Sequence, residues 1–501
     1  GGVERVRVVR AAGELRIEIE SLLTEGGRPY SLVEAGTGDL NTNLFRGTFL
    51  HPRALGGALA LSLDRVDTQG PRGREEGAGW GGWIRYARPI PWDGVFLMDF
   101  STMSGNRGEL YDPEQASRSD WSLRTRWTPL PRVTGELYYG GSSLKGKEEE
   151  ADTFPFTPQS HRRFGATVGF DSDWVRALGR VEKLSGAGLP GSWATVEASG
   201  GLGRYGGVAG ELAWEDWEER SVSRTRLRVW TGSLWGLSLF AERGSGEYGL
   251  PYLSPVILPP DTVVGEGEEP TPPDTLAALV PGPRFTQHKG TRYGLRYRWR
   301  GLSLAAARLQ VETDSLFVMG LPFDREGQTF AGGTRKGLEI SAHVPLYWEG
   351  FSLQGSAQWW DQEEEVWQIG EDGEPTSDPV ASEDMPWRYL PRRNYEGRFS
   401  FHDTFFPTEN LEVWFDVGVK GRDAMAVPFL DSETLENPAG PVPQMVNFDQ
   451  SWFVRLQFRV VTVRAFIMWE NFSVRQRNQD IPGRILPATR SVYGVRWTMR
   501  N

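Results

Sequence analysis

The chain closes with the sequence Val492-Tyr493-Gly494-Val495-Arg496-Trp497-Thr498-Met499-Arg500-Asn501. Successive side chains of a β-strand point to opposite faces, so the apolar residues at alternate positions from Tyr493 to Met499 share one face. The residues between them share the other face, which is polar. The same stripe recurs along most of the chain, for example from Trp452 to Val460. This pattern indicates a sheet that is apolar outside and wet inside, which is a closed barrel in a membrane.

The overall composition agrees with a membrane barrel, although it resembles that of a soluble protein. The chain has 501 residues, a net charge of −11 and a mean hydropathy of −0.44. A barrel exposes only every second strand residue to lipid, so such values are ordinary for this class. Aromatic residues make up 12% of the chain, with 21 Trp, as expected for aromatic girdles. The absence of Cys excludes disulfides and zinc–thiolate sites.

Strand-like segments of period two cover most of the chain, and no stretch has a convincing helical period. They predict an all-β, antiparallel transmembrane barrel of about 22 strands, each near the ~10 residues that a tilted span needs. In the strand 302–313 the apolar stripe changes phase between Leu304 and Leu309, which predicts a bulge. The predicted strands are 13–23, 42–50, 58–67, 80–88, 95–104, 119–128, 133–144, 162–170, 174–185, 191–200, 207–217, 222–231, 237–246, 290–299, 302–313, 335–345, 351–362, 394–405, 411–423, 450–459, 462–473 and 490–500.

The connections between these strands differ in length in an ordered way. Short ones, such as 131–132, 300–301 and 406–410, separate pairs of strands. Between them lie long polar segments at 249–289, 314–334, 363–392, 425–448 and 474–489. Outer-membrane barrels have short turns on the periplasmic side and long loops outside. We therefore predict short periplasmic turns and long extracellular loops.

Both ends of the chain resemble TonB-dependent outer-membrane receptors. Gly1-Gly2-Val3-Glu4-Arg5-Val6 resembles the Gly-Gly-Val-Ile-x-Val strand that ends the plug domain of that family, and Gly13-Glu14-Leu15-Arg16 resembles the start of its first barrel strand. The segment 480–487, followed by 493–497, resembles its last loop and closing strand. Two departures are the plug, which is not present in this chain, and Asn501, which stands where an aromatic residue usually ends the family's barrels.

The resemblance implies two parts and a function. Residues 1–12 would be a remnant of the last plug strand and its linker, and residues 13–501 the outer-membrane barrel. The implied function is uptake of a scarce, bulky ligand (an iron chelate, a cofactor or an oligosaccharide), energised by a TonB-type partner through a plug. The alternative is a plugless pore, or a scaffold barrel whose lumen or loops hold a partner protein.

Two groups of residues are candidates for ligand contact. Loop aromatics Trp367, Trp387 and Tyr389 would stack on a ligand from outside, or would pack the loops together. Arg398 and Arg455 represent a lumenal face rich in Arg, which would attract anionic solutes or a plug, or would pair with acids on neighbouring strands. The Arg residues predicted to face inward are Arg124, Arg126, Arg224, Arg226, Arg228, Arg296, Arg298, Arg398, Arg455, Arg459, Arg464 and Arg496.

Several function classes find no support in the sequence. No Ser/His/Asp constellation and no Gly-x-Ser-x-Gly motif is present, so we expect no enzyme and no catalytic residues. The five His residues are scattered, and we expect no metal site and no cofactor. The negative charge argues against nucleic-acid binding. Acidic loop segments such as 148–150 and 363–365 would face outside, where they would be solvated or would bind divalent ions that bridge lipopolysaccharide.

Overall fold

The computed structural model describes most of the chain. The described residues are 3–11, 14–21, 28–69, 76–106, 115–145, 160–186, 189–218, 220–257, 277–317, 329–346, 350–361, 391–429, 442–446, 448–473, 479–481, 484–485 and 489–500. The helical content of these residues is the three-residue turn η3 (Gly203–Tyr205). No helix in the described part is long and apolar enough to cross a membrane.

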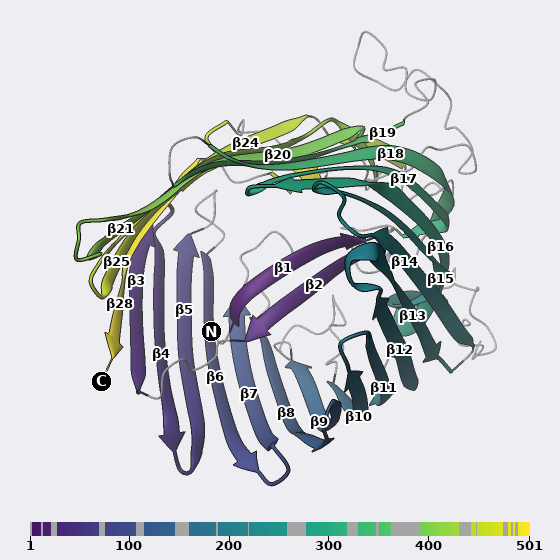
Figure 1. Cartoon of the computed structure of the whole chain (residues 1–501), viewed down its shortest axis with the longest axis horizontal. Coiled ribbons are helices and arrows are strands. Elements are labelled where there is room, and N and C mark those ends of the chain that lie inside the picture. Colours follow the sequence, from purple (N-terminus) through teal and green to yellow (C-terminus); the bar gives the residue numbers. More distant parts are fainter. Residues whose placement is uncertain are drawn as a thin grey trace, which may run out of the picture.

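The main body is a closed barrel of 22 antiparallel strands, as predicted. Figure 1 shows the ring, in which the last strand lies beside the first. The barrel strands are β3 (Tyr30–Gly38), β4 (Thr42–Ala54), β5 (Gly57–Gln69), β6 (Glu76–Ile90), β7 (Gly94–Asn106), β8 (Gln115–Leu130), β9 (Val133–Lys145), β10 (Ser160–Asp171), β11 (Val175–Ser185), β12 (Ser192–Gly201), β13 (Gly206–Asp216), β14 (Ser221–Thr231), β15 (Leu237–Ile257), β16 (Ala277–Trp299), β17 (Leu302–Phe317), β18 (Thr329–Pro345), β19 (Phe351–Trp360), β20 (Arg393–Phe405), β21 (Leu411–Arg422), β24 (Asp449–Val460), β25 (Val463–Glu470) and β28 (Arg490–Arg500).

Three small hairpins are not part of this closed sheet. β1 (Val3–Ala11) pairs with β2 (Glu14–Ser21), and in the view of Figure 1 this hairpin is drawn within the outline of the ring. β22 (Met425–Phe429) pairs with β23 (Val442–Val446), and β26 (Gln479–Ile481) pairs with β27 (Arg484–Ile485). The last two hairpins belong to connections between barrel strands.

The strand faces have the polarity that the closing segment predicts. On β28 the outward side chains of Tyr493, Val495 and Trp497 are 52%, 47% and 51% exposed. The neighbouring Arg496 points to the other face, where it meets Glu34 of β3. Large apolar side chains are exposed in this way around the ring. A monomeric soluble protein rarely exposes so extensive an apolar surface, so this outer face is the lipid-facing face of a membrane barrel.

The two rims of the barrel differ as predicted. At one rim every connection is two to five residues long: 55–56, 91–93, 131–132, 172–174, 202–205, 232–236, 300–301, 346–350, 406–410 and 461–462. The longest connections, 258–276, 361–392, 423–448 and 471–489, all belong to the other rim. That rim also has shorter ones, such as 39–41 and 217–220. In outer-membrane barrels the short-turn rim is periplasmic.

The predicted first strand is wrong in one respect. Residues 13–23 were expected to open the barrel, but Glu14–Ser21 pairs along its whole length with Val3–Ala11, outside the wall. The wall begins instead at β3, which no predicted strand covered. The outward positions of β3 are Ser31, Val33, Ala35 and Thr37, so its lipid-facing stripe is too weak to stand out. The assignment of residues 1–12 to a plug remnant stays a prediction.

The predicted bulge in 302–313 is also wrong. β17 pairs without any register shift with β16 from Leu302 to Thr313, and with β18 over the same segment. The apolar stripe changes phase because Leu309 points into the barrel and is buried, whereas Leu304 points outward. The outward neighbour Arg308 lies towards the long-loop rim, where it pairs with Asp361. The outer face therefore becomes polar as the strand leaves the apolar layer, and the backbone needs no distortion.

We predict that a charge on the outer face at mid-strand destabilises the barrel much more than one on the inner face. Phe415 and Leu456 are cross-strand partners on the outer face, and Gln457 is the next residue, on the inner face. Phe415→Arg or Leu456→Arg should each cost about 2–4 kcal/mol, because the guanidinium would enter hydrocarbon. Gln457→Arg is the control and should cost far less. Equal costs at both faces, in a denaturant titration in lipid vesicles, would contradict the assignment of the faces.

Candidate functional site: the lumenal face of the barrel wall

The inner face of the wall is lined with charged side chains that pair with one another. Strand alternation places one residue in two on this face, and antiparallel register sets Arg and acid side by side on neighbouring strands. This supports the reading in which mixed charges pair across the wall. The ion pairs among the described residues of this face include Glu34–Arg496, Arg46–Asp64, Arg85–Asp99, Arg180–Glu182, Arg226–Glu211, Arg228–Glu242, Arg292–Glu339, Arg455–Glu470 and Arg459–Glu412.

The most buried network joins β14, β15, β16 and β18. Glu242 forms ion pairs with Arg228 (Nε to Oε1, 3.2 Å) and with Arg292 (Nη1 to Oε2, 3.6 Å). Arg292 in turn contacts Glu339, with Nη2 2.8 Å from Oε1. Gln358 of β19 donates to the other oxygen of Glu339 at 3.1 Å. Since Arg292 and Glu242 are almost fully buried, removing either one would leave an uncompensated charge, which typically costs about 3–5 kcal/mol.

A second network locks β9 to β11 across β10. The hydroxyl of Tyr138 donates to Glu182, and Arg180 Nε donates to the same hydroxyl oxygen at 2.8 Å. The Arg180 guanidinium lies 5.4 Å from the Tyr138 ring centre and 4.8 Å from that of Trp193. Gly165 of β10 lies beneath the Tyr138 ring, and a Cβ there would come within 2.3 Å of it. A side chain at this position would therefore require the Tyr138 ring to move.

A third group lies on the inner face close to the short-turn rim. The ring of Trp414 stacks on His402 (5.2 Å between centres, 5° between planes), and the Arg464 guanidinium lies 4.2 Å from the Trp414 ring centre. Glu412 lies 2.8 Å from His402 Nε2 and also pairs with Arg459. The face of an aromatic ring attracts a guanidinium group through the quadrupole of the ring. The group joins β20, β21, β24 and β25 where these strands begin or end.

The structure brings together two of the five predicted ligand residues. Arg398 and Arg455 both point inward, on β20 and β24, which flank β21. Arg398 donates to Gln354 at 2.6 Å and lies 3.8 Å from Asp416, the register partner of Arg455. Arg455 lies 3.6 Å from Glu470. The two arginines are two strands apart and two residues out of register, so their backbones lie roughly 12 Å apart on one wall.

The other three predicted ligand residues, Trp367, Trp387 and Tyr389, lie outside the described residues. Their role as aromatic ligand contacts stays a prediction. The acidic segments 148–150 and 363–365 also lie outside the described residues. Within the described part of the chain, no group of three or more His, Asp or Glu side chains is placed to hold a metal ion.

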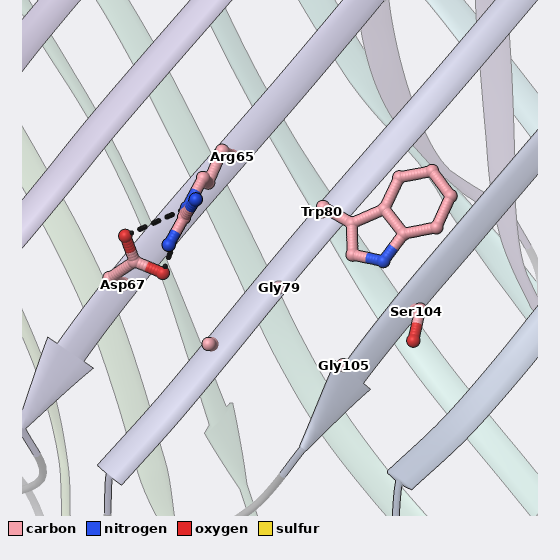
Figure 2. Close-up of a pocket in the computed structure, with 7 residues that line it drawn as sticks. Arg65, Asp67, Gly79, Trp80, Ser104 and Gly105 are labelled. Carbon is pink, nitrogen blue, oxygen red and sulfur yellow. Dashed lines mark hydrogen bonds and ion pairs between the residues drawn. The ribbon is translucent and has the colours of Figure 1, made fainter.

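A depression of about 460 Å³ lies on the outer face and not in the lumen. Figure 2 shows Arg65 and Asp67 on one strand, Gly79 and Trp80 on the next, and Ser104 on a third. Arg65 Nε donates to Asp67 at 3.0 Å, so its charge is already paired. Arg65 is the register partner of Phe45 and Trp80, which are both exposed outward. We therefore assign this depression to the lipid headgroup region and not to the path of a solute.

Some residues of the lumenal networks were not predicted from the sequence. Arg228 was predicted to face inward, but its network partners Glu242, Arg292 and Glu339 were not. Arg292 alternates in phase with Arg296 and Arg298 on β16, so its inward direction could have been predicted from the sequence. Its pairing with Glu339 could not be predicted, because 47 residues separate the two and the register of β17 decides the contact. For the same reason the Tyr138–Glu182 pair, 44 residues apart, could not be seen.

We predict that Gly165→Ala destabilises the barrel by about 1–3 kcal/mol, because its methyl group would overpack against the Tyr138 ring. Gly179→Ala is the matched control, since a Cβ at Gly179 has no heavy atom within 4 Å. It should change stability by less than about 0.5 kcal/mol. The midpoint of unfolding in detergent, followed by the gel mobility of the folded barrel, measures both variants. If the two changes were equally costly, the packing of Tyr138 over Gly165 would be refuted.

The fold of this chain is similar to that of several solved structures, although its sequence matches no known family. No family model and no curated protein matches the sequence. Among solved structures, the siderophore receptor PirA of Acinetobacter baumannii matches with a TM-score of 0.68 and 10% identity, over 99% of this chain and 85% of that one. A variant of the ferric enterobactin receptor PfeA of Pseudomonas aeruginosa gives 0.67 and 11%, over 99% and 85%. The FrpB iron transporter of Neisseria meningitidis gives 0.64 and 10%, over 99% and 87%.

At such low identity these matches show the fold. The chain has the 22-strand barrel fold of TonB-dependent receptors, as the resemblance implied for the barrel. This fold and the apolar outer face together assign the barrel to the bacterial outer membrane. The plug is not tested by these matches.

Proposed function

We propose that this chain is the barrel of an outer-membrane receptor that takes up a scarce, bulky metal chelate, most simply a ferric one. The observation that carries the proposal is the closed 22-strand wall with an apolar outside and a charged lumen. Its support from other proteins is that structures of the same fold are a siderophore receptor, a ferric enterobactin receptor and an iron transporter. None of these proteins is described as an enzyme, and we propose no catalytic role for this chain.

The size of the barrel supports a bulky cargo. A barrel of eight strands is filled by its own side chains, whereas barrels of about 22 strands enclose a lumen that requires a plug. Here the charged groups of the lumenal face pair along the wall, as Arg292 does with Glu242 and Glu339. Such a wall is hydrated and offers hydrogen bonds to a passing solute. It would not hold a large polar solute as tightly as a dedicated pocket, which suits a path that must also release its cargo.

Within the proposal, two kinds of residue contact the ligand. Arg398 and Arg455 present guanidinium groups from one part of the wall and would engage carboxylate or phenolate oxygens of a chelate. Asp416 lies near Arg398 and across from Arg455, so each cation is partly compensated and would bind an anion reversibly. The loop aromatics Trp367, Trp387 and Tyr389 would stack on the ligand at the entrance.

Uptake through this barrel would require an energising protein partner and contact with the lipids of the outer membrane. A bulky solute cannot be concentrated by an open pore, so uptake would need a TonB-type energising partner acting through a plug. The remaining contacts would be with outer-membrane lipid and lipopolysaccharide, along the belt of exposed Trp, Phe and Leu side chains. A surface or lumenal protein partner belongs to the alternative function, a passive pore or scaffold.

Uptake of a radioactive ferric chelate tests the proposal. The complete gene is expressed in cells that lack their own iron receptors, with and without a working TonB system. We expect accumulation of iron only when both the gene and TonB are present. Equal uptake without TonB would mean a passive pore. No uptake, together with no conductance of the purified chain in a planar bilayer, would favour a scaffold.

The same assay tests the lumenal ligand residues. Arg398→Gln combined with Arg455→Gln should raise the half-saturating chelate concentration at least several-fold, because two charge-assisted contacts are lost. Arg65→Gln is the control, since Arg65 is on the outer face and outside any solute path. It should leave the half-saturating concentration unchanged. A double variant that behaves like the Arg65 control would remove Arg398 and Arg455 from the binding path.

A further inference from the structure

Two arginines of β16 differ from the ion-paired residues of the lumenal wall described above. The inward positions of this strand include Arg292, Gly294, Arg296 and Arg298. Arg292 is buried and shares Glu242 and Glu339. Arg296 and Arg298 form no ion pair with any residue in the described part of the chain. Their side chains are also more accessible than that of Arg292: Arg296 is half-buried and Arg298 is exposed.

No acid stands directly opposite these two arginines on the strands on both sides of β16. The register partners of Arg296 are Ser238 on β15 and Ala305 on β17. Those of Arg298 are the turn residue Gly236 and Ser303. One strand further, on β18, Ala305 and Ser303 pair with Ser341 and His343. All of these neighbours except His343 have short side chains, so none of the residues opposite the two arginines can form an ion pair with them.

The net charge around the two arginines is positive, and the orientation of the guanidinium groups is partly fixed. Four guanidinium groups, those of Arg228, Arg292, Arg296 and Arg298, face two carboxylates, those of Glu242 and Glu339, which leaves an excess of two positive charges. The Phe240 ring supports two of these cations, with the Arg292 guanidinium 4.8 Å and the Arg296 guanidinium 5.8 Å from its centre. Such stacking holds a guanidinium in place and leaves its edge free to donate.

The position of the pair along the barrel axis is near one mouth. Arg298 is separated by Trp299 alone from the turn 300–301, which belongs to the rim of short connections. In a barrel of this fold that rim faces the periplasm. The pair is therefore close to the exit of the lumen, and Arg398 and Arg455 are on other strands of the wall, from β20 to β24.

We propose that Arg296 and Arg298 form an anion site at the periplasmic end of the lumen, for a solute that carries two or more carboxylate or phosphate groups. Residues i and i+2 of a strand are about 7 Å apart, so the two guanidinium groups can each take one anionic group of such a molecule. Each donates two parallel hydrogen bonds to a carboxylate or phosphate. The inference rests on the proposed uptake function, to which it adds an anionic cargo and the last contact of that cargo on the wall.

The same anionic groups could come from an acidic polypeptide that fills the lumen, and the experiment separates the two sources. Calorimetric titration of the full chain in detergent uses three probes: citrate, inorganic pyrophosphate and an octapeptide of Asp. Acetate serves as the monovalent reference. We expect citrate and pyrophosphate to bind at least tenfold more tightly than acetate, with an affinity that falls as salt is raised.

Variants assign the binding to the pair. Arg296→Gln with Arg298→Gln should weaken citrate at least tenfold, and the Lys double variant should lie between it and the wild type, because ammonium groups keep the charge without the planar fork. Arg85→Gln is the matched control, since Arg85 is a lumenal arginine already paired with Asp99 at 2.6 Å, and citrate affinity should stay within twofold. Gel mobility of the heated and unheated barrel shows that each variant is folded.

Three results would overturn the proposal: no binding of citrate or pyrophosphate by the wild type at millimolar concentration, equal binding by the Gln double variant, or binding of the Asp peptide alone. The last would mean that the pair serves a polypeptide. These outcomes do not depend on transport. Polyanion binding without iron uptake would refute the proposed function and keep the site, and iron uptake without polyanion binding would refute the site only.

Discussion

The closure of the sheet is the constraint on which the rest of this structure depends. Hydrocarbon offers no hydrogen bonds, so every backbone N–H and C=O inside the bilayer needs a partner in the protein. The ladder between β28 and β3 supplies the last of these partners, from Val492 opposite Gly38 to Arg500 opposite Tyr30. Arg496 and Glu34 reinforce this seam from the lumen, with Nε 2.6 Å from Oε2. Without the seam, two strand edges would face lipid with unpaired groups.

Closure of the sheet also determines the polarity of the residues on each face. One residue in two meets lipid and is apolar, and the remaining residues enclose a space too wide for side chains to fill. Charges on that inner face are tolerated because neighbouring strands supply their partners, as Glu242 does for both Arg228 and Arg292. Where the neighbours are small and uncharged, as around Arg296 and Arg298, the cations stay available to a solute. The described part of the wall thus contains paired charges that stabilise the barrel and unpaired cations that can bind a solute.

Much of this architecture could be read from the sequence, because period-two polarity is a local signal. It located nearly every wall strand and separated the short-turn rim from the rim with the long loops. It failed at β3, where Ser31 and Thr37 weaken the outward stripe, and at Glu14–Ser21, whose clear alternation belongs to a hairpin with Val3–Ala11. A local pattern cannot tell which partner a strand will choose.

The site was less accessible to sequence reasoning for the same reason. The inward direction of Arg398 and Arg455 follows from strand phase, and the register of the described strands agrees with it. Their surroundings do not follow from phase. The stack of His402 on Trp414 and the pairing of Arg398 with Asp416 depend on which strands become neighbours and in which register. Register across several strands is a property of the whole closed sheet and is not encoded in any one segment.

In a membrane barrel, alternate residues of one strand must face lipid and water. Because the chain has no Cys, single cysteines can be placed along β24 without side reactions. A water-soluble thiol reagent and a lipid-borne quencher are then applied to the barrel in vesicles, residue by residue from Phe453 to Phe458. We predict that positions 453, 455 and 457 react with the soluble reagent and that positions 454, 456 and 458 respond to the lipid quencher. A uniform response along the strand, or the opposite phase, would contradict the account.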